Sequence, residues 1–364
     1  MRHFGQLDAD LRRRLFHREP VPVERDGDPG ALGTALGGTL YCPATRATLA
    51  ADVRRQAERG AVSLVICLED AIADSEVPAA EANLVAQLTE LALDGGPADR
   101  LPLLFVRVRA PGQIEALTRR LGPAAALLSG YVLPKFTEAV GAEYLERLAA
   151  AEEQCGRRLF GMPVLESPEL AHLEHRRTEL LAVAELLAKH RERVLAVRLG
   201  VTDLCAAYGL RRSPQLTAYD LALVAAVIGD VVNVFGRADG TGFTVTGPVW
   251  EYFPLHRRGP ELEGLLRELE LDRANGLLGK TCVHPSQLPV VHAWSVVSHE
   301  EYSDARDILR REAGGVLGSS YTNKMNEAGP HRVWAERTLR RAEAFGVARA
   351  EVGFGELLSA VCGG

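Results

Sequence analysis

The chain alternates short apolar runs with longer amphipathic stretches, and this alternation repeats eight times between residues 39 and 294. The apolar runs are nearly continuous, which is typical of parallel strands buried on both faces, and the stretches have helical spacing. The runs occupy residues 39–42, 63–68, 103–108, 127–133, 159–165, 194–199, 243–252 and 277–283. The stretches that follow them lie at 46–59, 77–93, 114–121, 139–153, 174–189, 218–235, 261–274 and 285–294.

Eight strand–helix pairs spread over about 250 residues predict a closed (β/α)8 barrel. The main alternative is an open doubly wound sheet, but no G-x-G-x-x-G follows any of the runs, which disfavours a dinucleotide-binding sheet. We predict an α/β fold, a (β/α)8 TIM barrel at 38–297. An N-terminal extension precedes it at 1–37. A C-terminal helical lid or oligomerisation segment follows at 298–364, with helices at 301–311 and 333–345.

Composition excludes several classes of function. The 42 Lys and Arg residues against 48 Asp and Glu residues give a formal net charge of −6, and no long basic block is present, so we expect no nucleic-acid partner. No run of about 18 apolar residues occurs, so we expect no membrane association. The six cysteines form no C-x-x-C pair, and the first residues lack an apolar targeting stretch. These features favour a reduced, cytoplasmic compartment.

Ionisable residues follow several of the predicted strands. In a barrel, the carboxyl ends of the strands meet at one face, where functional residues gather. Burying several carboxylates together is unfavourable without compensation, and a divalent cation provides it. Because the candidate ligands are hard oxygen atoms, they favour Mg²⁺; ordinary salt bridges at the barrel mouth are the alternative. The residues of this ring are Glu69, Asp70, Glu166, Asp203, Arg46 and Arg107.

Lys135 is the only lysine that the pattern places at the barrel mouth. It could form a Schiff base, which is the metal-free route to an aldol cleavage. Ion pairing with Glu166 or its acidic neighbours is the interpretation we favour, because several carboxylates are expected nearby.

An ordered set of motifs resembles a known family, the HpcH/HpaI aldolases, which include the citrate lyase beta-subunit and malyl-CoA lyase. The matching segments come in the family's order over about residues 38–345. They are LYCPATR at 40–46, VICLEDAI at 65–72, FVRV at 105–108, VLPK at 132–135, VLE at 164–166, RLGVTDL at 198–204, GKTCVHPSQ at 279–287 and NKM at 323–325. The ordered set is far more specific than any one of these motifs.

This resemblance implies a role for each matched residue. Glu166 and Asp203 match the family's two Mg²⁺ ligands, and Arg107 matches the arginine that binds the substrate's carboxylate or oxyanion. Glu69 and Asp70 match the acidic pair that serves the acid–base steps. Substrate-binding roles are expected for Arg46 in the first loop, and for Arg107, Arg109 and Lys135.

The resemblance also implies an activity, a Mg²⁺-dependent carbon–carbon bond lyase. It would perform a retro-aldol or retro-Claisen cleavage, or the reverse condensation, on a 2-oxo acid, a hydroxy acid or an acyl thioester of CoA or a carrier. A homo-oligomer, a trimer or hexamer, is implied as well. The alternatives are a thioester hydrolase acting on a malyl-CoA-like substrate and a non-catalytic binding protein on the same barrel.

Two positions depart from the family's usual pattern. Arg109 stands where Asn is common, and Thr202 stands where Glu commonly precedes the metal-binding Asp203. One change adds positive charge and the other removes negative charge. We therefore predict a substrate with an extra carboxylate or phosphate near Arg109.

Overall fold

The predicted strands form one closed barrel in the computed structural model, which describes residues 1–94, 98–253, 259–312 and 314–362. The strands follow chain order around the barrel, and each neighbouring pair is parallel, including the pair of first and last strands that closes it. This confirms the (β/α)8 barrel and excludes the open sheet. The strands are β2 (Gly38–Pro43), β3 (Ser63–Cys67), β4 (Leu103–Arg107), β5 (Leu128–Leu133), β6 (Phe160–Leu165), β7 (Val197–Leu199), β8 (Val245–Trp250) and β9 (Lys280–Cys282).

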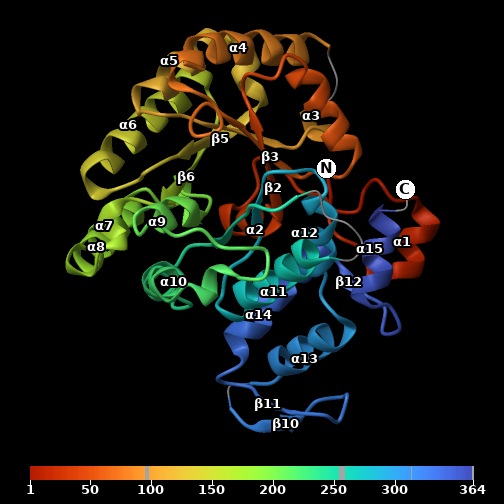
Figure 1. Ribbon diagram of the computed structural model, residues 1–364. Helices are drawn as coiled ribbons and strands as arrows, with labels where there is room; N and C mark the ends of the chain where they lie inside the picture. The colour runs from red at the N-terminus through yellow and green to blue at the C-terminus, as the bar shows by residue number, and fades with distance from the viewer. Residues whose placement is uncertain (95–97, 254–258, 313, 363–364) are drawn as a thin grey trace. The chain divides into compact units, whose positions relative to one another are not determined.

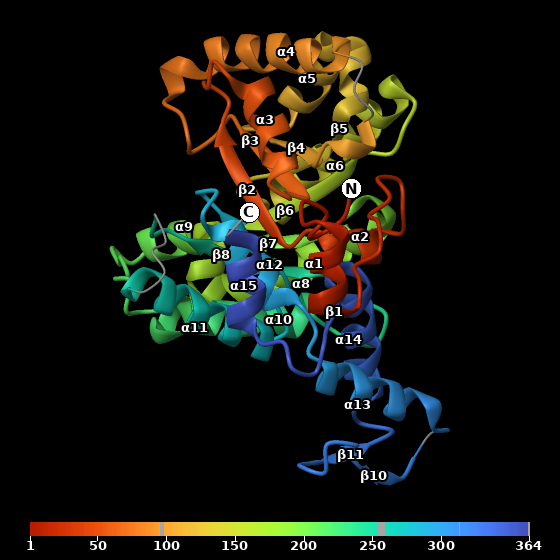
Figure 2. The same cartoon turned by 90° about the vertical axis from the view of Figure 1, so that its right-hand side faces the viewer.

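The continuous apolar runs follow from burial on both sides of the barrel wall. In β3, the consecutive residues Leu64, Val65 and Ile66 are each at most 1% exposed, although neighbouring side chains of a strand point to opposite faces. One face packs inside the barrel and the other lies under the helices, as Figures 1 and 2 show for α3 to α6. A run without alternation is therefore what this architecture requires.

Helices follow the strands at the predicted places. They are α3 (Leu49–Glu58), α4 (Val77–Leu93), α5 (Gly112–Leu121), α6 (Glu138–Cys155), α8 (Leu173–Lys189), α10 (Ala222–Phe235), α11 (Pro260–Ala274) and α12 (Gln287–Ser295). Two short helices, α7 (Pro168–Ala171) and α9 (Val201–Ala206), were not predicted. Both begin close after a strand on the side of the barrel where the acidic residues lie.

The opposite end of the barrel is covered by α2 (Pro29–Ala35), which the sequence analysis assigned to the extension. Asp28 caps this helix, because its Oδ1 accepts a hydrogen bond from the backbone N–H of Ala31 at 2.9 Å. The carbonyl of Gly37 then accepts from the N–H of Lys280 at 2.9 Å, at the start of β9. This helix therefore leads into the amino end of the barrel, opposite the carboxyl ends of the strands, where the predicted functional residues lie.

A second compact unit comprises residues 1–24 and 289–364, while residues 25–288 form the barrel unit. The helices predicted at 301–311 and 333–345 are present as α13 (His299–Arg310) and α14 (Arg332–Phe345). This division differs from the predicted segments, because the first residues of the chain are grouped with its last ones. Of the predicted segment 298–364, residues 313, 363 and 364 lie outside the described residues.

Short antiparallel pairings hold this second unit together. Strand β1 (Phe16–Arg18) pairs with β12 (Val347–Ala348), and β10 (Val316–Gly318) pairs with β11 (Met325–Glu327) in a hairpin. Two further helices, α1 (Ala9–Leu15) and α15 (Phe354–Cys362), belong to the same unit and were not predicted.

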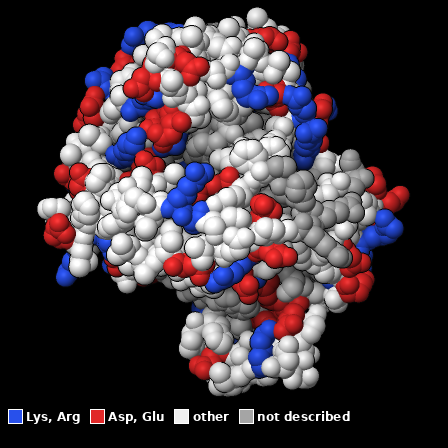
Figure 3. All heavy atoms as spheres, viewed as in Figure 1, with Lys and Arg blue, Asp and Glu red and all other residues white. Residues whose placement is uncertain are grey.

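Acidic and basic side chains are interspersed on the face of the molecule drawn in Figure 3. This mixture agrees with the mild net charge of the chain. None of the helices in the described part of the chain combines the length and apolar character needed to cross a membrane. The six cysteines form no disulfide bond with one another.

Candidate active site

The barrel fold brings the predicted acidic ring together at the carboxyl ends of its strands. Glu69 and Asp70 directly follow β3, and Arg107 is the last residue of β4. Glu166 directly follows β6, and Asp203 lies in the first turn of α9, after β7. These side chains are far apart in sequence but converge in space, because parallel strands end on the same face of the barrel.

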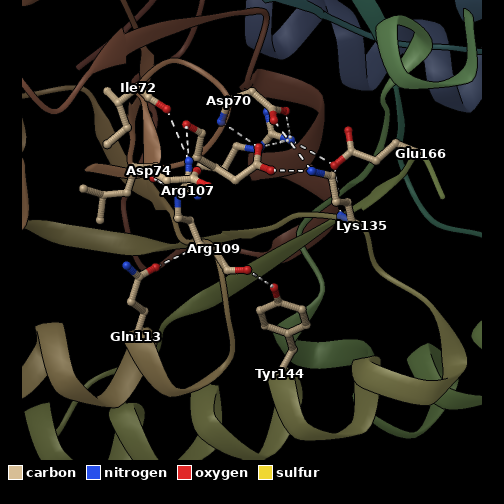
Figure 4. A network of polar contacts seen from close by, with 11 residues as sticks. Asp70, Ile72, Asp74, Arg107, Arg109, Gln113, Lys135, Tyr144 and Glu166 are labelled. Atoms are coloured by element: carbon tan, nitrogen blue, oxygen red, sulfur yellow. Dashed lines mark hydrogen bonds and ion pairs between the residues drawn. The ribbon is translucent and has the colours of Figure 1, made fainter. Parts of the chain in front are cut away.

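Arg107 is the centre of the site (Figure 4). Its Nη2 atom lies 2.8 Å from Oε2 of Glu69 and 3.1 Å from Oδ2 of Asp70. The same atom lies 2.9 Å from Oε1 of Glu166. Burial opposes the charge of Arg107, but Glu166, Tyr41 and Glu69 hold its pKa above the usual value. One guanidinium thus links three carboxylates that come from two different strands.

Lys135 lies beside the same carboxylates, as predicted for an ion-pairing lysine. Its Nζ atom is 2.8 Å from Oε1 of Glu69 and 3.7 Å from Oδ1 of Asp70. Its backbone N–H donates to Oε1 of Glu166 at 2.9 Å, and its φ angle of +47° lies in the left-handed region. The hydrogen bond to Glu69 raises the pKa of Lys135, so its amine is held in the protonated form.

Glu166 is 4% exposed, and burial raises the pKa of its carboxyl group to about 7 despite the opposing effect of Arg107. Asp203 raises this pKa further, because two nearby negative charges repel. The pKa of Asp203 is also raised, first by burial and then by Asp70. Glu166 and Asp203 therefore lie close enough to destabilise each other's charge.

The two residues of the acidic pair after β3 have pKa values that are shifted in opposite directions. Burial and the hydrogen bond with Asp70 raise the pKa of Glu69. Burial also opposes the charge of Asp70, but Glu69, Arg107 and Lys135 together hold its pKa below the usual value. Two adjacent carboxyl groups whose pKa values are pushed apart can divide the work of acid and base.

Charge counting shows which kind of ligand the site suits. The four carboxylates Glu69, Asp70, Glu166 and Asp203 face two cationic side chains, Arg107 and Lys135. When all are ionised, the site carries two negative charges in excess, which a divalent cation would balance. Within the described ranges, no group of three or more His, Cys, Asp or Glu side chains is arranged to bind a metal ion. A cation held by Glu166 and Asp203 would therefore complete its coordination with water and substrate, as Mg²⁺ commonly does.

Arg109 supports the loop that carries the acidic pair. Its Nε donates to the carbonyl of Leu68 at 2.8 Å, and its Nη2 donates to the carbonyl of Ile72 at 3.2 Å. Its Nη1 lies 2.6 Å from Oδ1 of Asp74 (Figure 4). These contacts form only in the folded loop, so they could not be predicted from the sequence. The predicted contact between Arg109 and a substrate stays a prediction.

Arg46 forms an ion pair with a residue outside the ring that the sequence predicted for it. Its Nε is 2.6 Å from Oδ2 of Asp52, in α3, and its side chain is half exposed. Among the described residues, no ion pair joins Arg46 to any of the four carboxylates. Its substrate-binding role also stays a prediction.

The comparisons with known proteins agree with this geometry. Residues 31–347 match the family described as C–C bond lyase of the TIM-barrel fold. None of the proteins with curated descriptions matches the chain.

Among solved structures, the protein CitE of Mycobacterium tuberculosis, in complex with magnesium, acetoacetate and coenzyme A, is 24% identical with a TM-score of 0.54. The match covers 85% of this chain and 99% of that one. Malate synthase of Haloferax volcanii, in a lead(II) complex, is 16% identical with a TM-score of 0.52. That match covers 70% of this chain and 71% of the malate synthase chain. These likenesses show a shared fold. The family match covers most of the chain and confirms the resemblance found in the sequence, and the chain belongs to the carbon–carbon bond lyases of the TIM-barrel fold.

Proposed function

We propose that the chain is a Mg²⁺-dependent lyase that breaks a carbon–carbon bond in a 2-oxo acid, a hydroxy acid or its acyl thioester. The observation that carries this proposal is the link from Arg107 to Glu69, Asp70 and Glu166, next to Asp203. The solved CitE structure contains magnesium, acetoacetate and coenzyme A, which supports the same classes of metal and ligand for this chain.

Glu166 and Asp203 are the residues that would hold Mg²⁺. Their mutual repulsion is relieved by a cation, and the excess of two negative charges fits a divalent one. When bound, the metal would polarise a substrate carbonyl as a Lewis acid.

Arg107 would bind the carboxylate or the developing oxyanion of the substrate. Its buried Nε atom has no hydrogen-bond partner among the described residues, so a donor remains for a ligand. A guanidinium already fixed by three carboxylates needs little reorganisation when negative charge develops, and such preorganised donors are effective in catalysis.

Glu69 and Asp70, the acidic pair, would carry out the proton transfers of the reaction. As the carbon–carbon bond breaks, the hydroxyl group of the substrate would give its proton to the acidic pair and become the carbonyl of one fragment. The bonding electrons leave with the other fragment as an enolate, which then takes up a proton at carbon. Glu69, with its raised pKa, can hold that proton, and the neighbouring Asp70 stays ionised and half exposed at the mouth. In the condensation direction, the same pair would remove the proton from the carbon of the acyl fragment.

Product analysis tests the proposal. The full chain is incubated with Mg²⁺ and hydroxyacyl-CoA thioesters, and the products are identified by mass spectrometry. A lyase yields a carbonyl compound and a shorter acyl-CoA, whereas a thioester hydrolase yields only the free acid and CoA. Products of hydrolysis alone would overturn the proposal.

Calorimetry tests the metal site separately. Glu166→Ala and Asp203→Ala should each abolish measurable Mg²⁺ binding, while Glu174→Ala, a change in the first turn of the outer helix α8, should not. Unchanged Mg²⁺ affinity in both site variants would contradict the assignment of these ligands.

We also propose that the chain acts as a homo-oligomer, a trimer or a hexamer. Support comes from apolar side chains exposed in the second unit, where Val316 is 63%, Met325 53% and Trp334 41% exposed. Exposed apolar residues of this size are common at protein interfaces. Light scattering should give three or six times the mass of the chain, and a stable monomer would contradict this.

A further inference from the structure

A second arginine lies inside the barrel, deeper than Arg107. Arg198 is in β7 and is 1% exposed. Its Nη2 donates to Oγ1 of Thr281, in β9, at 2.6 Å, and its Nη1 reaches Oγ1 of Thr39, in β2, at 3.5 Å. In the closed order, β9 and β2 are two and three strands away from β7. The side chain therefore spans the interior of the barrel.

The charge of Arg198 has no carboxylate partner among the described residues, and its buried Nε atom has no hydrogen-bond partner there. By contrast, the buried Arg212 is paired with Glu268, and the buried Arg176 is paired with Asp230. Burying a guanidinium group without a partner costs several kcal/mol, about as much as breaking a buried ion pair. An unpaired buried charge of this kind indicates a functional role for Arg198.

Tyr41 lies between this arginine and the active site. Its ring centroid is 5.6 Å from Cζ of Arg198, and it follows Thr39 by two residues in β2, so both side chains point to the barrel interior. Burial raises the pKa of the Tyr41 hydroxyl, whereas Arg198 and Arg107 both lower it. The hydroxyl is thus within electrostatic reach of two guanidinium groups.

The tyrosine is accessible where the arginine is not. Tyr41 is partly exposed, whereas Arg198 is almost completely buried. None of the hydrogen bonds in the described part of the chain involves the Tyr41 hydroxyl. The Tyr41 hydroxyl is therefore a free donor within electrostatic reach of Arg107.

We propose that the Tyr41 hydroxyl is a second hydrogen-bond donor to the anionic oxygen that Arg107 binds, and that Arg198 is a positioning residue that acts through Tyr41. This inference rests on the proposed function. A hydroxyl flanked by two guanidinium groups favours a charged acceptor, because hydrogen bonds to ionised groups are about twice as strong as neutral ones. The pair would therefore select a ligand with a carboxylate or enolate oxygen at this position.

Oxalate with Mg²⁺ is a suitable probe, because it is a planar dianion that presents the paired oxygens of a 2-oxo acid. Tyr41→Phe keeps the ring and removes only the hydroxyl. We expect it to weaken oxalate binding about 10-fold or more, the range for a hydrogen bond to a charged group. Its affinity for Mg²⁺ alone and its melting temperature should stay close to those of the wild type. Tyr131→Phe is the matched control, because that hydroxyl contacts Thr118 at 2.7 Å, outside the site.

A double-mutant cycle tests the role of Arg198. If Arg198 acts through Tyr41, Arg198→Lys should weaken oxalate binding in the wild type but add little in the Tyr41→Phe background. Equal losses in both backgrounds would overturn the positioning role, and unchanged oxalate affinity in Tyr41→Phe would overturn the inference as a whole. If the wild type binds Mg²⁺ but never oxalate, the proposed function fails first and the inference fails with it.

Discussion

A Cβ atom on Gly200 would lie only 2.1 Å from Oε2 of Glu166. Gly200 directly precedes α9, so the carboxylate of Glu166 packs against the backbone from which Asp203 projects one turn later. Any side chain at position 200 would push Glu166 away. The two candidate metal ligands are therefore neighbours only because this residue is glycine.

Gly200→Ala should lower the affinity for Mg²⁺ about 10- to 100-fold, the range seen when the support of a metal ligand is disturbed. The φ angle of Gly200 is −97°, which alanine can adopt, so the change acts through the contact of the added Cβ with the side chain of Glu166. Calorimetry measures the affinity. Gly229→Ala is the control, because nothing lies within 4 Å of its added Cβ. Equal Mg²⁺ affinity in the two variants would refute this reading.

Lys135 should not form a Schiff base. A Schiff base needs the neutral amine, but the hydrogen bond to Glu69 raises the pKa of Lys135 and keeps it protonated at neutral pH. Treatment with pyruvate and borohydride should leave the intact mass of the protein unchanged. A stoichiometric adduct that disappears in Lys135→Arg would show that the metal-free route operates.

Arg109→Asn separates two roles for this arginine. If Arg109 mainly braces the loop through the carbonyls of Leu68 and Ile72, the variant should lose affinity for all anionic ligands to a similar extent. If it also contacts substrate, ligands with an extra carboxylate or phosphate should lose the most. Calorimetric titration with oxalate and with a phosphorylated 2-oxo acid compares the two classes. Unchanged affinity for both would exclude both roles.

The sequence predicted the barrel because a strand buried on both faces leaves a local signal. Leu64, Val65 and Ile66 are apolar in succession, and no contact from elsewhere in the chain is needed to interpret them. The ring of Glu69, Glu166 and Asp203 was predictable for a related reason, since the end of a strand can be located locally and the barrel then brings the ends together.

Other features were hidden because they depend on tertiary contacts. In the sequence, Arg109 cannot be distinguished from other arginines at the barrel mouth. Its hydrogen bonds to the carbonyl groups of the loop after β3 exist only in the folded protein. Tyr41 fits the sequence pattern of a core strand. Its proposed functional role can be inferred only from its distance to Arg198 across the barrel. Gly200 could have been identified from the sequence, because it is a glycine between a strand and a helix with an acidic first turn.

Removing the cation from a buried ion cluster should destabilise the barrel strongly. Nζ of Lys280 lies 2.6 Å from Oε1 of Glu268 and 2.7 Å from Oδ2 of Asp272, and all three residues are at most 2% exposed. Lys280→Met leaves the buried carboxyl group of Asp272 without a cation and leaves Glu268 with Arg212 alone, which should lower the free energy of unfolding by about 3–5 kcal/mol. Urea denaturation measures this loss.

Arg119→Met provides a surface control for that experiment. Its partner is Glu115, and the arginine side chain is 65% exposed. Removing such a pair should change the free energy of unfolding by about 0.5 kcal/mol or less. A similar small effect of Lys280→Met would mean that the buried cluster relaxes or admits water.

Asp304 should make the β10–β11 hairpin sensitive to acid. This carboxylate, in α13, is 0% exposed and accepts hydrogen bonds from Oγ of Ser319 at 2.7 Å and Nδ2 of Asn326 at 2.9 Å. Nζ of Lys324 lies 2.8 Å away. Burial opposes its charge, but Lys324, Ser319 and Asn326 hold its pKa below the usual value of an aspartate.

Because the folded pKa of Asp304 is lowered, its stabilising contribution is present above the unfolded value and is lost as the pH falls through the folded one. The hairpin should therefore loosen below about pH 4, the ordinary range of an aspartate. Hydrogen exchange of the Ser319 amide, which donates to the carbonyl of Lys324 at 3.0 Å, reports this opening after correction for intrinsic rates. Asp304→Asn should loosen the hairpin already at neutral pH and remove its dependence on acid, whereas Asp10→Asn, in α1, should do neither. Equal protection of this amide in the wild type and in Asp304→Asn at neutral pH would show that this carboxylate does not hold the hairpin.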